Sequence, residues 1–209
     1  MKLQNIGGIS SIGTAILVVI VLVIILIMFP RLGVVGPSDW SDPVKSLDAA
    51  STSPITFFIL NLVMILVSIA YILIVLALRE RMQAAPNLMQ IAVIALSINC
   101  ALWFAYGVIG IVGMPSIVSA KDISALRAAN AIHFGLSTSG DCAAGWVLLL
   151  IGWAALRTRG LPRILSYFSM LKGVVMILEF AAQPLMLVGL LLGIIFYPWL
   201  GIVLLRSKS

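Results

Sequence analysis

Four polar residues recur at helical spacing in the fourth apolar region of the chain. Asn130, His133, Ser137 and Asp141 follow one another at intervals of three, four and four residues, so they lie along one face if the segment is helical. An amide, an imidazole, a hydroxyl and a carboxylate on one face could line a polar cavity open to the outer side, or they could hydrogen-bond to neighbouring helices. The spacing leaves both interpretations open.

Two ionisable residues stand in the next apolar region. Lys172 and Glu179 are seven residues apart, which is two helical turns along nearly the same face. A charge at hydrocarbon depth is costly without a partner, so we expect Lys172 to turn inward and to meet an acceptor from another helix. Asp141 is the favoured carboxylate and Asn99 the favoured neutral group. The alternative is that Lys172 reaches the membrane surface and that Glu179 lies among the headgroups.

Polar side chains at hydrocarbon depth most often mark the functional region of a membrane protein. We therefore group these residues, with the amides of the second and third apolar regions, as one candidate intramembrane polar cluster. Its members are Asn61, Asn99, Asn130, His133, Ser137, Asp141, Lys172 and Glu179.

The motifs of the common enzyme and metal sites do not occur in the sequence. One histidine, His133, cannot make a two-histidine haem site or a zinc site of the usual composition, so no metal and no cofactor are expected. A single axial bond to a haem or a chlorophyll-type pigment is the minority alternative. Cys100 and Cys142 both fall in apolar regions without metal-ligand spacing, which is typical of thiols that pack as small apolar groups. We expect no catalytic residues and no enzyme activity.

The composition defines the environment in which these residues act. The 209 residues are 62% hydrophobic and 10% charged, with a mean hydropathy of +1.20. A soluble domain carries about 25% charged residues, so this chain has too few charges to cover a surface in water, and its partner must be the lipid bilayer. The net charge of +6 comes from basic residues at the ends of apolar runs, which indicates a topology signal and excludes nucleic acid.

The apolar runs predict an all-α integral membrane protein, a single transmembrane domain over residues 1–209 with a bundle of about six helices. Met114 and Pro115 are expected to end the third span, and the fourth could start anywhere between Ala129 and Ser139. A short interfacial helix from Pro43 to about Ala50, beside Trp40 as a headgroup-level anchor, is expected in the first outer loop. The predicted spans are 8–29, 55–78, 88–112, 133–156, 164–180 and 184–205.

Small residues predict two faces where helices approach each other closely. Gly107, Gly110 and Gly113 fall near one face of the third span, and Gly189 and Gly193 form a GxxxG arrangement in the sixth. Such faces let the backbones of neighbouring membrane helices come into contact. We interpret both as packing features and not as catalytic signals.

The basic residues predict the orientation. With the amino terminus inside, the cytoplasmic side carries Lys2, Arg79, Arg81, Arg157, Arg159, Arg163, Arg206 and Lys208, and the outer side carries Arg31, Lys45, Lys121 and Arg127. Eight basic residues against four satisfy the positive-inside rule. We therefore expect a multi-pass protein with both termini in the cytoplasm.

The last third of the chain has a recognisable pattern. It runs from Gly145 to Leu150 (GWVLLL), through Ala154–Thr158 and Leu161-Pro162-Arg163, to Leu192–Gly201 (LGIIFYPWLG). This resembles a bacterial family of small six-span integral membrane proteins classed only as a domain of unknown function. The resemblance implies six spans and a prokaryotic inner (plasma) membrane, and it brings no functional residues.

Three functions remain after these exclusions. The first is a non-catalytic membrane protein, an accessory or assembly subunit that contacts other membrane subunits through its helices. The second is a carrier of a small molecule or ion that uses the polar cluster, although the chain has neither an internal repeat nor paired broken helices. The third is a pigment- or haem-binding subunit, which rests on His133 alone.

Overall fold

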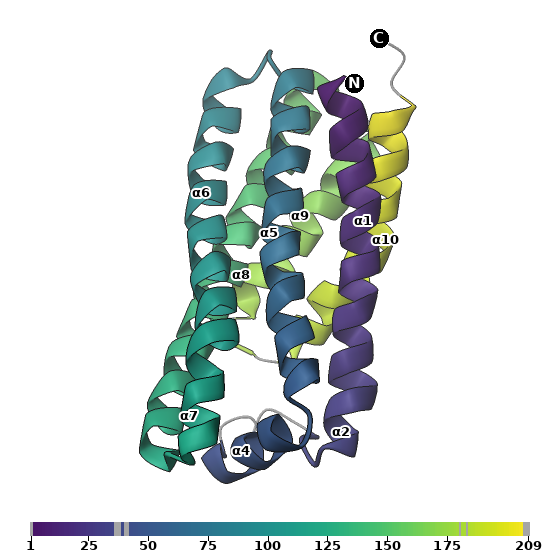
Figure 1. Ribbon diagram of the computed structural model, residues 1–209. Coiled ribbons are helices and arrows are strands. Elements are labelled where there is room, and N and C mark those ends of the chain that lie inside the picture. The colour runs from purple at the N-terminus through teal and green to yellow at the C-terminus, as the bar shows by residue number, and fades with distance from the viewer. Residues whose placement is uncertain (1, 36–38, 40–41, 180, 183, 207–209) are drawn as a thin grey trace.

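The computed structural model describes residues 2–35, 39, 42–179, 181–182 and 184–206, and every element within them is helical (Figure 1). The all-α fold predicted from the sequence is thus confirmed. Trp40 lies outside the described residues. In chain order the helices are α1 (Leu3–Val23), η1 (Ile24–Met28), α2 (Phe29–Arg31), α4 (Pro43–Thr52), α5 (Pro54–Arg81), α6 (Pro86–Val108), η2 (Ile109–Gly113), α7 (Met114–Ala120), α8 (Ile123–Thr158), α9 (Arg163–Leu178) and α10 (Leu185–Leu205).

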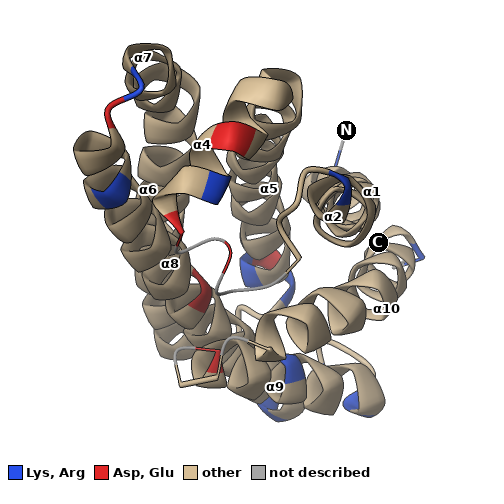
Figure 2. Cartoon of the chain, turned by 90° about the horizontal axis from the view of Figure 1, so that it is seen from below, with Lys and Arg blue, Asp and Glu red and all other residues tan. Residues whose placement is uncertain are grey.

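The longer helices form a closed ring. α1 contacts both α5 and α10, α8 contacts both α6 and α9, and the pairs α5–α6 and α9–α10 complete the circle. Figure 2 shows this ring from one end and shows how few of its positions carry a charge. The first and last helices therefore lie side by side, and each helix has one face toward the ring interior.

The bundle has the dimensions and surface of a membrane protein. Five continuous helical stretches are long and apolar enough to cross a bilayer: Leu3–Arg31, Pro54–Arg81, Pro86–Ala120, Ile123–Thr158 and Leu185–Leu205. Large apolar side chains such as Ile16, Ile94 and Ile195, each more than half exposed, cover the outer surface. In water this surface would be unstable, and in a bilayer it is the expected one.

The two ends of the bundle differ. α1 begins and α10 ends at one end, together with the α5–α6 and α8–α9 turns, while α4 and α7 lie at the other (Figure 1). We call these the terminal face and the α4 face. α9 has 16 residues and α8 has 36, or about 24 Å against about 54 Å. The connection from α9 to α10 therefore lies at a depth that α8 passes through.

Two predicted helix ends are wrong, because in both cases the helix continues past a proline that was expected to end it. The first helix continues through Pro30 to Arg31, and the third passes Pro115 and ends at Ala120. In each case a π-helical segment, η1 or η2, ends two residues before the proline. A proline clashes with the carbonyl four residues earlier in a regular α-helix, and the shifted hydrogen bonds of a π segment relieve that clash while the helix continues.

The start of the fourth helix is also earlier than predicted. α8 begins at Ile123, where the Asp122 carboxylate accepts a hydrogen bond of 2.9 Å from the Ala125 N–H. The apolar pattern had marked only the part of the helix that lies in hydrocarbon. The short helix α4 agrees with its prediction, since Asp42 caps it by accepting from Val44 N–H at 2.9 Å.

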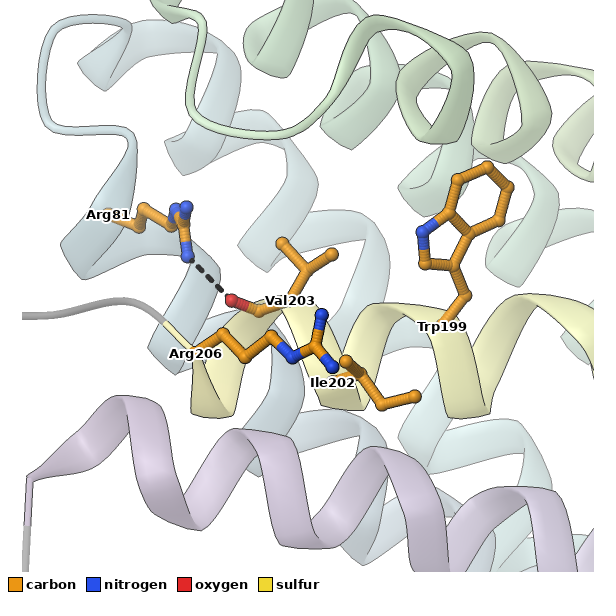
Figure 3. A pocket seen from close by; sticks show the side chains of 5 residues that line it. All are labelled: Arg81, Trp199, Ile202, Val203 and Arg206. Atoms are coloured by element: carbon orange, nitrogen blue, oxygen red, sulfur yellow. Dashed lines mark hydrogen bonds between the residues drawn. The ribbon is translucent and has the colours of Figure 1, made fainter.

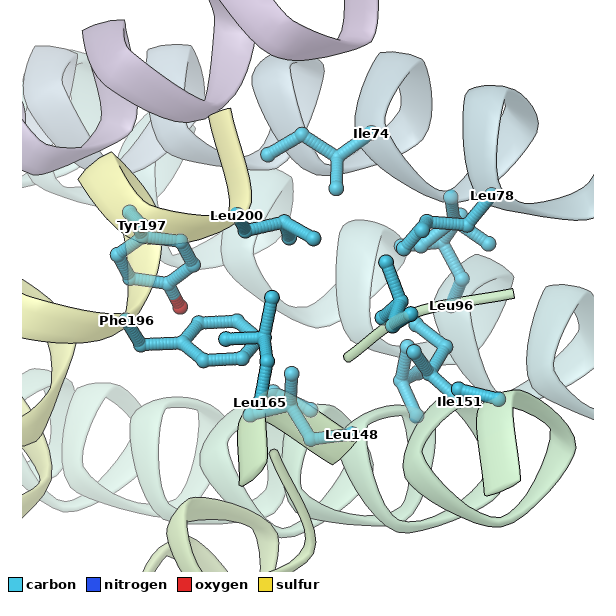
Figure 4. Close-up of a cluster of buried hydrophobic side chains, with 14 of the residues drawn as sticks. Ile74, Leu78, Leu96, Leu148, Ile151, Leu165, Phe196, Tyr197 and Leu200 are labelled. Carbon is cyan, nitrogen blue, oxygen red and sulfur yellow. The ribbon is translucent and has the colours of Figure 1, made fainter. Parts of the chain in front are cut away.

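The apolar core fills the ring toward the terminal face. Leu78 of α5, Leu165 of α9 and Leu204 of α10 are completely buried, and Ile151 of α8 is 2% exposed. Figure 4 shows Leu78, Leu165 and Ile151 converging with Phe196 and Leu200. A dry core at one end limits any polar interior to the other part of the bundle.

Candidate functional site

Lys172 points into the ring, as predicted. Its side chain is 3% exposed, and its Nζ donates a hydrogen bond of 2.8 Å to the Gly189 carbonyl of α10. The ammonium also lies 5.5 Å from the centre of the Tyr197 ring, within the range of a cation–π interaction. The alternative that Lys172 extends to the membrane surface is excluded.

The partner of Lys172 is not the predicted one. We expected Asp141 or Asn99, but a backbone carbonyl accepts the hydrogen bond. The carbonyl of Gly189 can accept this bond beside its own helical one because it has two lone pairs. A Cβ at Gly193 would lie 3.6 Å from the Nζ of Lys172. That is an ordinary contact distance, whereas a Cβ at Gly189 would collide with Oε1 of Glu179, so Gly189 leaves room for this carboxyl group beside the ammonium.

Asp141 and Glu179 form a carboxyl pair beside this lysine. Asp141 projects from the inner face of α8, and Glu179, at 8% exposure, caps the carboxyl end of α9. The two side chains lie within hydrogen-bonding range, and both are close enough to act on the Lys172 ammonium electrostatically. Two carboxyl groups can hydrogen-bond to each other only when one of them carries a proton, so this pair beside a buried cation is suited to holding one.

Two tyrosines extend this polar group across the ring. The hydroxyls of Tyr71 on α5 and Tyr197 on α10 are in hydrogen-bond contact, and the Ser11 hydroxyl of α1 donates to the Tyr197 carbonyl at 2.7 Å. Five helices of the ring thus contribute to one connected set of polar contacts. Tyr71 and Tyr197 were not predicted to belong to the polar cluster, because the sequence does not distinguish an aromatic residue that forms polar contacts from one that only packs in the core.

The polar face of α8 turns away from lipid. Asn130, His133, Ser137 and Asp141 are all partly buried, while the intervening Phe134 is 52% exposed. The ring of His133 stacks on Tyr106 of α6 at 4.3 Å between centres. Ser137 donates to the Phe134 carbonyl of its own helix at 3.0 Å. These four side chains thus lie at least partly within the bundle, and the polar cavity along this face of α8 stays a prediction.

The two amides of the candidate cluster face neighbouring helices. Asn99, fully buried on α6, donates from Nδ2 to the Gly140 carbonyl of α8 at 2.8 Å. Asn61 on α5 donates to the Phe57 carbonyl of its own turn at 2.7 Å, and its side chain lies where a Cβ at Gly110 would stand. Both amides thus sit at close helix contacts, and Gly110 belongs to the small-residue face predicted for α6.

Three polar atoms inside the bundle lack a hydrogen-bond partner among the described residues. They are Oδ1 of Asn61, Oδ1 of Asn99 and Nε2 of His133, and they come from α5, α6 and α8. Buried polar atoms of this kind usually bind ordered water. Together with the inner face of α8, they mark a hydrophilic interior between these three helices.

Charged groups hold the segment before α4 in place. Lys45 at the start of α4 donates to Asp39 at 2.6 Å, and Asp39 also accepts from the Val35 N–H at 2.8 Å. The hydrogen bond and the charge of Asp39 raise the pKa of Lys45 above its ordinary value. These contacts lie on the surface of the α4 face, apart from Lys172.

The cluster therefore divides into parts with different roles. Lys172, Asp141 and Glu179 come together, Asn99 lies against α8 one residue from Asp141, and Asn61, Asn130 and His133 line the interior. Within the described residues no group of three or more histidine, cysteine, aspartate or glutamate side chains could hold a metal ion. Side chains of these types in one place could exchange protons or bind a small charged or polar solute.

Comparison with known proteins does not identify the polar cluster. No family model, no curated protein and no solved structure matches the chain. The resemblance of the last third to a bacterial six-span family stays a prediction.

Proposed function

We propose that this protein is a small membrane carrier that binds protons at the Asp141–Glu179 pair and links their movement to that of a small polar solute. The observation that carries the proposal is that the carboxyl groups of Asp141 and Glu179 lie close to each other and to the buried ammonium of Lys172. Ionisable groups at this depth are characteristic of proton relays and ion pathways in membrane proteins.

The energetics support a functional role for these groups. Replacing buried ionic groups by apolar side chains of similar volume is often neutral or stabilising, by about 1–4 kcal/mol. The helices around Lys172 already pack through Leu165, Met176 and Phe196, so an apolar residue would hold the ring together equally well. A sequence under selection for packing alone would have no use for three ionisable groups here.

The geometry also supports access from the α4 face. The inner face of α8 carries polar groups from Asn130 to Asp141, on the side of the bundle away from the apolar core. Glu179 sits in the connection between the shorter helices α9 and α10, at a depth that α8 passes through. A proton or solute entering along α8 would reach the carboxyl pair before it reached Lys172.

The same proposal includes six crossings, with α9 as the fifth span and α10 as the sixth, both termini in the cytoplasm and the α4 face outside a prokaryotic inner membrane. The positive-inside distribution of the basic residues supports it, as does the position of both chain ends at the terminal face. In this orientation the carboxyl pair is reached from outside and the dry core lies toward the cytoplasm.

The other functions predicted from the sequence stay predictions. For an accessory subunit, the exposed apolar residues are those that any lipid-facing surface has, so they favour no particular protein partner. For a pigment or haem site, the stack of His133 on Tyr106 places an aromatic ring against the only histidine. No catalytic residue is proposed.

Proteoliposomes test the carrier. Purified protein is reconstituted with a pH-sensitive dye inside, an inside-negative potential is imposed, and proton entry is followed with and without external amino acids, organic cations or sugars. We expect protein-dependent proton entry, increased by at least one solute class, and loss of most of it in Asp141→Asn and Glu179→Gln. Asp48→Asn, an exposed acid on α4, is the matched control and should transport as the wild type does. Proton entry equal to that of protein-free vesicles under all conditions would contradict the proposal.

A further inference from the structure

A second charged feature lies at the terminal face, far from the carboxyl pair. The ends of α5 and α10 enclose a hollow of about 470 Å³ lined by Arg81, Trp199, Ile202, Val203 and Arg206 (Figure 3). Two of these five residues are arginines, and none is acidic. An apolar wall with two guanidinium groups is an arrangement that an anion would neutralise.

The arginines come from different helices and are held differently. Arg81, partly buried at the end of α5, donates from Nη1 to the Val203 carbonyl at 3.2 Å. That bond uses one of the five guanidinium N–H groups and fixes the orientation of the others. Arg206, which is exposed, extends along α10 toward the same hollow, so the two guanidinium groups flank Val203 (Figure 3).

Trp199 sets the position of this hollow relative to the membrane. Its ring lies 6.4 Å from that of Phe168 on α9, and its indole nitrogen is on the side that faces the arginines (Figure 3). Tryptophan is enriched at headgroup level. Ile202 and Leu205 on the same helix are 43% and 40% exposed, so the surface next to the hollow is lipid-facing.

The neighbouring hollow shows what distinguishes this one. A second hollow of about 470 Å³ at the same face is lined by Arg79, Glu80 and uncharged residues. There the positive charge of Arg79 is offset by the negative charge of Glu80, so the lining carries no net charge. Of these two hollows, the one between α5 and α10 combines two basic groups with an acid-free lining.

We propose that Arg81, Arg206 and Trp199 bind the phosphate headgroup of an anionic phospholipid. The guanidinium groups would donate to phosphate oxygens, a geometry for which arginine is suited. The indole N–H would donate to the glycerol region, and the acyl chains would lie along the exposed face of α10. Basic hollows between membrane helices are known to recognise anionic headgroups. The inference does not depend on the carrier function.

Binding of short-chain lipids to the detergent-solubilised protein tests the proposal. The probes are short-chain phosphatidylglycerol, phosphatidylcholine with the same chains, and inorganic phosphate, and the measurement is the Kd from a titration. We expect saturable binding of phosphatidylglycerol only. Since a hydrogen bond to a charged group is worth about 1.5–3 kcal/mol, Arg81→Gln and Arg206→Gln should each weaken binding by about tenfold or more.

Arg79→Gln is the matched control, because Arg79 lies on the same helix as Arg81 but lines the second hollow, beside Glu80. The Kd of this variant for phosphatidylglycerol should equal that of the wild type. Arg206 is exposed at the helix end, so Arg206→Gln tests the site even if Arg81→Gln fails to fold. An equal loss in the Arg79 variant, or equal binding of phosphatidylcholine, would overturn the proposal. Inorganic phosphate that binds as tightly as the lipid would assign the site to a soluble anion and overturn the lipid assignment.

Discussion

The Lys172 ammonium donates to the Gly189 carbonyl and has two carboxyl groups close by. Its depth was predictable, because a lysine nine residues after Arg163 is about 13 Å from the helix end and cannot reach water easily. Its acceptor was not predictable. That choice depends on which turn of α10 faces α9 and on a glycine leaving space there, neither of which is written in the periodicity of one helix.

At this scale we predict that Lys172→Met is tolerated better than Asp141→Ala. Without the lysine, Asp141 and Glu179 can each bind a proton, so no uncompensated charge is left in the bundle. Without Asp141, Glu179 loses its hydrogen-bond partner and the charges around Lys172 are no longer balanced. We expect the free energy of unfolding to fall by at most roughly 1 kcal/mol in Lys172→Met and by about 3 kcal/mol in Asp141→Ala, because removing one partner of a buried ionic contact costs about 3–5 kcal/mol. Thermal denaturation in detergent measures both.

Lys121→Met, at an exposed position, serves as the control and should change little. Small and equal losses in the Lys172 and Asp141 variants would show that the bundle gains nothing from these groups, and the buried pairing would be refuted.

At the scale of elements, the contact between α8 and α9 depends on paired glycines. A Cβ at Gly145 would lie 2.6 Å from the Gly173 carbonyl, and a Cβ at Gly173 would lie 2.7 Å from the Gly145 carbonyl. The two backbones therefore touch, which brings the Asp141 and Glu179 side chains into range of each other. The sequence analysis found glycine faces in the third and sixth spans but not this one, because two single glycines on different helices form no motif.

We predict that Gly145→Ala destabilises the protein by about 1–3 kcal/mol, the usual cost of overpacking. Gly135→Ala on the same helix is the matched control, since nothing lies within 4 Å of its Cβ position. It should be neutral or stabilising by up to about 1 kcal/mol, because alanine favours a helix more than glycine does. Thermal unfolding of the two variants in one detergent decides the matter, and equal effects would refute the proposed backbone contact.

The helix ends show where sequence reasoning stops. Apolar runs locate the hydrocarbon-embedded part of each span, and they predicted α10 within one residue at its start. They cannot show that a helix continues into the polar region, as α8 does for ten residues before position 133. Nor do they show that a π segment carries a helix past Pro30 or Pro115, because that depends on neighbouring helices that hold the chain in line.

At the scale of the whole molecule, the carboxyl pair lies beside the middle of α8, and the arginine hollow lies at the terminal face. Reporter fusions test the proposed orientation, in which both termini are cytoplasmic and the α4 face is outside. Fusions at Ser209 and in the 79–87 turn should report a cytoplasmic location, and one within residues 42–50 an external location, because the basic residues concentrate at the terminal face. An external signal from Ser209 would mean that α9 and α10 do not together return the chain to the cytoplasm.

We propose that Asp141 and Glu179 share a proton, and infrared spectroscopy of the purified protein tests this directly. A protonated carboxyl group gives a C=O stretching band distinct from that of a carboxylate. The wild type should show this band at neutral pH, Asp141→Asn and Glu179→Gln should each remove or shift it, and Asp48→Asn should leave it unchanged. If the wild type shows no protonated carboxyl band at neutral pH, or if both variants keep it unaltered, the carboxyl pair does not hold a proton and the proposed carrier site is wrong.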